Sequence, residues 1–149
     1  MLRTPQSIAA EHAELHEVLA GATREAGALG EAAQELEAAL APHFHREEEV
    51  ATPPLGLLAS IAAGEPVDDM TAVLPLTDAL ERELPQMLRE HEAIREALAG
   101  FRTAAQAAGR EDYVRFSEAL AAHARQEEEI LYPAAILVGR YVRAMTAER

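Results

Sequence analysis

The chain has 149 residues, no cysteine and a formal net charge of −13. A chain of this length can bury one continuous core, so we expect a single domain spanning residues 1–149. The negative charge repels nucleic acid and anionic lipid, so we expect neither as a partner. Without thiolates, any bound metal must be held by nitrogen and oxygen ligands.

The composition also indicates the fold class. Helix-forming residues dominate, and aromatic residues make up only 4% of the chain, which favours an all-α protein. No apolar run is long enough to span a bilayer, and acidic residues follow the N-terminus too closely for a secretory signal. We therefore expect a cytoplasmic protein with no membrane partner, and the sequence indicates no particular protein partner.

Four segments carry apolar residues at alternating three- and four-residue steps, the pattern of a helix with one face in a core. They begin near Ile8, Ala33, Leu80 and Phe116. Glycines or prolines separate them, so the sequence predicts an up-down four-helix bundle. The expected helix pairs cover residues 4–52 and 78–132 approximately.

The remaining segments depart from a simple bundle. The connection between the second and third helices is long, with a short helix expected in LGLLASIAA at 55–63. Pro42 lies inside the second helix, where we expect a kink. Pro133 is expected to end or kink the fourth helix, and residues 134–147 are predicted to form a short C-terminal helix.

The sequence contains an internal two-helix repeat. EHAELHEVLAG at 11–21 aligns with EHEAIREALAG at 90–100, and HFHREEEVATP at 43–53 aligns without gaps with HARQEEEILYP at 123–133. The two halves are therefore predicted to be related helix pairs packed about a pseudo-twofold axis.

Histidines and glutamates interrupt the apolar faces of all four helices. Buried carboxylates and imidazoles are costly unless they are paired or bound to a metal. In the second and fourth helices the two residue types are four positions apart, about 40° around the axis, so both can point at one centre. A fully satisfied network without metal is the alternative. The predicted metal ligands are His12, His43, Glu47, His91, His123 and Glu127.

Other polar residues lie beside these faces. His16 is one turn after His12 but at the edge of the apolar face, so it is either a further ligand or a surface residue. His45 points away from the core, and we interpret it as solvated. The glutamates that follow the core-facing ones are interpreted as a solvated acidic face: Glu48, Glu49, Glu128 and Glu129.

Imidazole and carboxylate ligands suit iron, manganese, zinc or copper, and carboxylates from facing helices favour a two-metal centre. With five imidazoles, two bridging carboxylates and a bridging oxygen, a six-coordinate metal pair keeps one open position for a small ligand. With four imidazoles it keeps two.

These residues resemble the hemerythrin-like family, the HHE cation-binding domain, whose pattern is H, HxxxE, H, HxxxE on four successive helices. The match is His12, His43 with Glu47, His91, and His123 with Glu127. The resemblance implies two iron ions with an oxo or hydroxo bridge, open to a small diatomic ligand or peroxide. Other divalent metals are alternatives.

The chain departs from the oxygen-carrying members at Arg95, where they have a second histidine; His16 offers the equivalent in the other half. Our first interpretation is a non-haem di-iron protein that binds or senses oxygen in an apolar pocket lined by leucine, isoleucine and phenylalanine. Alternatives are detoxification of peroxide or nitric oxide, so an enzymatic role stays open, and iron donation for iron–sulfur cluster repair. A metal-free helical interaction module is the alternative of another class.

Overall fold

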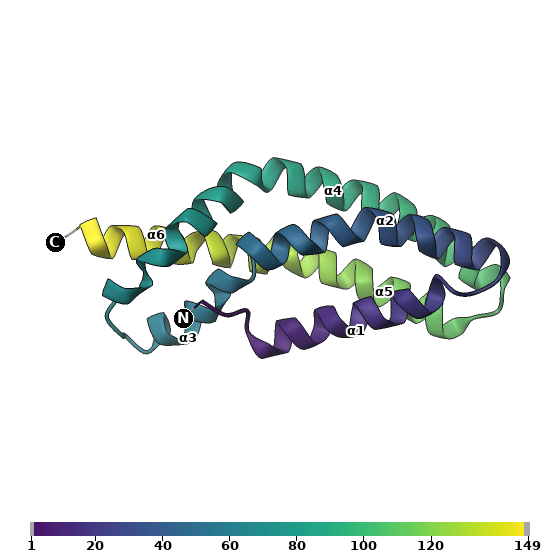
Figure 1. Cartoon of the computed structure of the whole chain (residues 1–149), viewed down its shortest axis with the longest axis horizontal. Coiled ribbons are helices and arrows are strands. Elements are labelled where there is room, and N and C mark those ends of the chain that lie inside the picture. The colour runs from purple at the N-terminus through teal and green to yellow at the C-terminus, as the bar shows by residue number, and fades with distance from the viewer. Residues whose placement is uncertain (1, 148–149) are drawn as a thin grey trace.

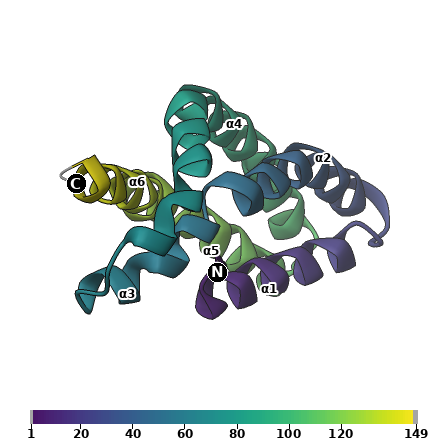
Figure 2. The same cartoon turned by 60° about the vertical axis from the view of Figure 1, so that its left-hand side comes forward.

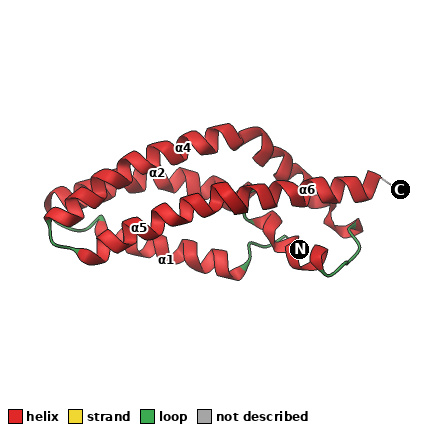
Figure 3. Cartoon of the chain, turned by 180° about the vertical axis from the view of Figure 1, so that it is seen from behind, coloured by secondary structure: helices red, strands yellow, loops and turns green. Residues whose placement is uncertain are grey.

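The computed structural model describes residues 2–147. These residues form helices joined by short connections, with no strand among them (Figure 3). The main helices of the bundle are α1 (Gln6–Ala22), α2 (Gly27–Val50), α4 (Leu74–Ala107) and α5 (Glu111–Gln126). The predicted all-α four-helix bundle is confirmed.

The four helices alternate in direction around one core. Helix α2 packs against α1 and α4, and α5 packs against α4 and α1. The turns from α1 to α2 and from α4 to α5 lie at one end, and the long connection lies at the other (Figures 1 and 2). Gly109, with a φ of 68°, adopts the left-handed conformation that ends α4 at the second of these turns.

The long connection contains three short helical segments: η1 (Pro53–Leu57), α3 (Leu58–Ala62) and η2 (Asp68–Val73). The short helix expected near LGLLASIAA is therefore present. Helix α4 begins at Leu74, earlier than the predicted position near residue 78. Proline is tolerated at Pro75 because backbone N–H groups in the first turn of a helix have no acceptor within the helix. Helices α2 and α4 continue through Pro42 and Pro85, so neither proline ends its helix.

The fourth helix does not stop at Pro133. Helix α5 passes into a π-helical turn, η3 (Glu127–Leu131), and then into α6 (Tyr132–Ala147), which continues in the direction of α5 (Figure 1). The Tyr132 N–H donates to the Glu127 carbonyl, five residues back. This wider turn carries the chain to Pro133 without a break.

The core is divided along the bundle axis. One apolar cluster at the turn end includes Leu36, Phe101 and Leu120, and a second includes Val50 and Met87. A third cluster packs α6 over the long connection. The predicted metal ligands occupy the polar layer between the first two clusters. No helix within residues 2–147 combines the length and apolarity needed to cross a membrane.

Candidate metal centre

Each of the four helices of the bundle brings a histidine into the polar layer. The four are His12 on α1, His43 on α2, His91 on α4 and His123 on α5. Glu47 on α2 and Glu127 at the start of η3 join them. All six side chains are buried, with exposures of 3% or less. The structure thus brings together all six residues predicted from the helical faces.

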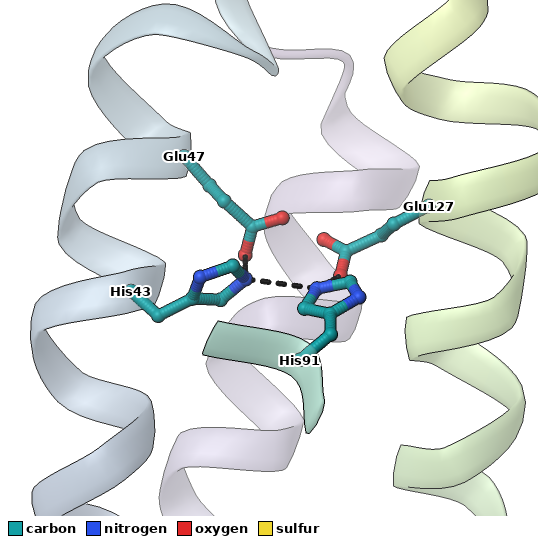
Figure 4. Close-up of side chains that lie close together, drawn as sticks. All are labelled: His43, Glu47, His91 and Glu127. Atoms are coloured by element: carbon teal, nitrogen blue, oxygen red, sulfur yellow. Dashed lines mark hydrogen bonds and ion pairs between the residues drawn. The ribbon is translucent and has the colours of Figure 1, made fainter. Parts of the chain in front are cut away.

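Four of these residues form a first group: His43, Glu47, His91 and Glu127. One ligand atom from each lies within 4.8 Å of the others. The two Nε2 atoms of His43 and His91 are 2.9 Å apart. His43 Nε2 lies 3.3 Å from Glu47 Oε1, and His91 Nε2 lies 3.3 Å from Glu127 Oε1. The two carboxylates point toward each other from facing helices (Figure 4).

A second group contains His12, His123 and again Glu127. The Nε2 atoms of the two histidines are 3.1 Å apart. Glu127 Oε2 lies 3.2 Å from His123 Nε2 and 3.7 Å from His12 Nε2. Glu127 therefore turns one oxygen toward each group, which is the arrangement of a bridging carboxylate.

Glutamates from neighbouring helices hold the opposite ring nitrogens. His43 Nδ1 is 2.8 Å from Glu90 Oε1, and His91 Nδ1 is 2.9 Å from Glu128 Oε1. His123 Nδ1 is 2.7 Å from Glu11 Oε1. A carboxylate accepts hydrogen bonds, so each of these Nδ1 atoms donates its hydrogen. In the neutral form of a ring that donates from Nδ1, the Nε2 atom presents a lone pair to the interior.

These lone pairs make the interior suited to a cation. In the first group, the Nε2 atoms of His43 and His91 face each other with no proton to share. Glu47 Oε1 and Glu127 Oε2 have no hydrogen-bond partner within the described part of the chain. Buried lone pairs and carboxylate oxygens without partners are unfavourable. A metal ion in each group would satisfy them, so the residues fit a pair of cations.

The ionisation of the two buried carboxyl groups differs. Burial raises the pKa of Glu47 well above its usual range, and the nearby Glu127 raises it further. Burial alone would also raise the pKa of Glu127. The neighbouring Glu47, His12, His123 and His91 instead hold that pKa well below its usual range. Without metal, the proton therefore resides on Glu47 and the charge on Glu127.

The glutamates that hold the histidines were not predicted as site residues, and Glu48 and Glu128 were assigned to a solvated face. For Glu128 this was wrong, because it bonds His91 and is also held by Arg95 at 2.6 Å. A signal for Glu11 and Glu90 did exist, since each directly precedes a histidine in the repeat. His45 is exposed and pairs with Glu49, as expected for the surface.

His16 lies outside both groups. It is exposed, and its ring meets the edge of Phe44 with centroids 4.8 Å apart. It lines an open pocket of about 520 Å³ that reaches His12, with Thr4, Ala9, Ala13 and Glu48 as the other lining residues. This pocket is more polar than the predicted leucine, isoleucine and phenylalanine lining. Coordination by His16 stays a prediction.

The fold and these groups define a class of protein: a helical bundle with a buried histidine and carboxylate site for cations. The family model of the hemerythrin HHE cation binding domain matches residues 5–135. The chain therefore belongs to this family, and membership implies that it binds metal ions, which in this family are usually iron. No curated protein and no solved structure shows significant similarity to the chain.

Proposed function

We propose that the protein is a non-haem di-iron protein that binds or senses oxygen or a related small ligand. The observation that carries the proposal is Glu127, whose two oxygens face two separate histidine groups. Carboxylate and imidazole ligands suit iron, and one bridging carboxylate shared between them favours a linked pair. When bound, the iron pair would supply an open coordination position for a small ligand.

The protein residues define where such a ligand enters. His12 lines the open pocket beside α1, so the second group is reached from solvent through this pocket. The first group lies deeper, because none of its four side chains is more than 2% exposed. The Phe44 ring stacks on His12 with centroids 4.7 Å apart and limits the space beside it. The pocket thus favours a small ligand at the second group.

Iron content tests the proposal. The protein is loaded with ferrous iron under argon, desalted, exposed to air and measured for metal per chain and for absorbance. We expect about two irons per chain with oxygen-bridged ferric absorption. Glu127→Ala should lose most of both irons, because this residue serves both groups. Glu49→Ala, which removes a surface partner of His45, is the matched control and should load normally.

The same samples provide the ligand test. Azide or nitric oxide should change the spectrum of the loaded protein and saturate at one ligand per iron pair. A reproducible single zinc per chain without iron absorption would contradict the di-iron centre. Full loading with no spectral response to either ligand would leave the metal centre and reject the ligand-binding role.

A further inference from the structure

A tyrosine hydroxyl lies among the donor atoms of the first group. Tyr132 is the first residue of α6, and its side chain is buried with 1% exposure. Its Oη lies 3.1 Å from His91 Nε2 and 3.3 Å from His43 Nε2. It also lies 2.6 Å from Glu47 Oε2. The hydroxyl oxygen is therefore in contact with three residues of the group.

The Tyr132 hydroxyl can donate only one hydrogen bond, although three potential partners surround it. A phenol carries one proton, and the short contact shows that Glu47 Oε2 accepts it. In the neutral rings the two Nε2 atoms present lone pairs, because the hydrogen of each ring is on Nδ1 and is donated to Glu90 or Glu128. Neither imidazole can therefore donate to Oη. Lone pairs of two imidazoles and one phenol therefore converge on one point.

The spacing of these three atoms matches one coordination shell. Metal bonds of about 2.1 Å at right angles place neighbouring donor atoms about 3 Å apart. The triangle of His43 Nε2, His91 Nε2 and Tyr132 Oη has sides of 2.9, 3.1 and 3.3 Å. All three donors can therefore share one ion, with carboxylate oxygens of Glu47 and Glu127 completing its surroundings.

We propose that Tyr132 is a ligand of the metal ion held by the first group, an assignment that rests on the metal centre proposed above. As the bond from Oη to the metal forms, the O–H bond breaks. Glu47 loses its own proton to solvent when it becomes a ligand, so its Oε2 can then accept the proton of Oη and release it to solvent. No electron is transferred in this step.

The second group has no equivalent donor. Thr52 takes the position of Tyr132 in the repeat, and its hydroxyl pairs with that of Thr4 at 2.8 Å. No hydroxyl within residues 2–147 hydrogen-bonds to His12 or His123. The two metal positions are therefore unequal: Tyr132 closes the first, and the second faces the open pocket. An added ligand binds at the second.

The π-helical turn explains why Tyr132 reaches the site. In a regular α-helix, residues five apart are separated by about 140° around the axis, so Tyr132 would point away from Glu127. The five-residue hydrogen bond from Tyr132 to Glu127 widens this turn and brings the two side chains toward one face. The first half makes the matching bond, from the Thr52 N–H to the Glu47 carbonyl at 3.0 Å, but its helix does not continue beyond that point.

The experiment compares the air-oxidised, iron-loaded protein with Tyr132→Phe. Ferric iron bound to a phenolate absorbs visible light by charge transfer, and excitation in that band enhances the vibrations of the tyrosinate ring. We expect both signals in the parent protein and their loss in Tyr132→Phe. Tyr141→Phe is the matched control, because Tyr141 is exposed on the same helix. It should keep both signals.

The outcomes separate this proposal from the metal centre itself. An iron-loaded parent without the phenolate signals overturns ligation by Tyr132 and leaves the di-iron proposal standing. Signals that persist in Tyr132→Phe also overturn it. A parent that takes up no iron overturns both. Because the ring vibrations are recorded on the parent alone, the test stands even if Tyr132→Phe folds poorly.

Discussion

The glutamates behind the histidines differ between the two halves of the repeat. Glu128 bonds His91 at 2.9 Å and is fixed by Arg95. Its repeat partner, Glu48, is 3.6 Å from His12 Nδ1, beyond hydrogen-bond distance. Outer carboxylates orient ligating histidines and raise their basicity. His91 is therefore held in place by a hydrogen bond to an outer carboxylate partner, whereas His12 is not.

This difference predicts unequal effects of matched substitutions. Glu128→Gln should lower metal affinity by roughly 10- to 100-fold, the usual cost of losing an outer carboxylate. Glu48→Gln should lower it by much less, because no hydrogen bond is lost. Competition with a coloured chelator measures both affinities. Equal losses in the two variants would show that Glu48 moves onto His12 when the metal binds.

His16 is the residue whose role the sequence left open, and a single variant decides it. If His16 completes the shell of the second metal, His16→Ala should retain the fold but change the visible spectrum and the azide affinity. If it only lines the pocket, the spectrum should match the parent. His45→Ala is the control, because His45 is exposed and pairs with Glu49 alone. An azide titration of both variants gives the answer.

The sequence predicted the residues of the buried groups better than their surroundings. His12, His43, His91 and His123 interrupt apolar stripes, so the helical period was enough to place them on the inner faces. Glu11, Glu90 and Glu128 lie at the edges of those faces. Which helix they meet depends on how the helices rotate and pair, and one sequence does not contain that information. Tyr132 was missed for a related reason, since a regular helix would point it elsewhere.

Helices α4 and α6 approach each other closely where Gly139 meets Thr77. A Cβ built on Gly139 would overlap the side chain of Thr77, which is itself buried. The glycine is therefore needed for its small size. Helix α6 can pack against the first turns of α4 only because this position carries no side chain.

Matched glycine substitutions test this contact. Gly139→Ala should destabilise the protein by about 1–3 kcal/mol, since overpacking forces the helices apart. Gly100→Ala should stabilise it by about 0.5–1 kcal/mol, because Gly100 is exposed within α4 and nothing lies within 4 Å of its added carbon. Urea unfolding measures both changes. Destabilisation by Gly100→Ala, or neutrality of Gly139→Ala, would contradict the packing described.

The helices themselves were predictable because each carries a sustained apolar period, and the prolines explain where the prediction was weaker. Pro53 and Pro54 together end regular helix after α2, whereas the single Pro133 is accommodated by the π turn. Two similar motifs in the repeat thus end differently. The first motif is followed by a second proline, Pro54, where the second motif has Ala134. The helix after Pro133 also packs against α4, and the local sequence pattern does not reveal that contact.

The metal centre should contribute to the stability of the folded protein. A ligand that binds only the folded state adds about 2.7 kcal/mol at a free concentration one hundred times its Kd. Iron-loaded protein should therefore melt at a clearly higher temperature than chelator-treated protein, and Glu127→Ala should show a smaller difference. Calorimetry or circular dichroism measures it. Identical melting curves would favour the metal-free interaction module.

Hydrogen bonds between histidines and outer glutamates also join three of the four pairs of neighbouring helices around the bundle. Glu11 joins α1 to α5, Glu128 joins η3 to α4, and Glu90 joins α4 to α2. Glu48 faces His12 across the remaining junction, between α2 and α1. An ion in the first group lies behind these bonded junctions, so it can leave only when a helix separates from its neighbours. We therefore expect exchange of the first metal to be governed by the rate of helix separation and to be slower than exchange of the second metal, which faces the open pocket.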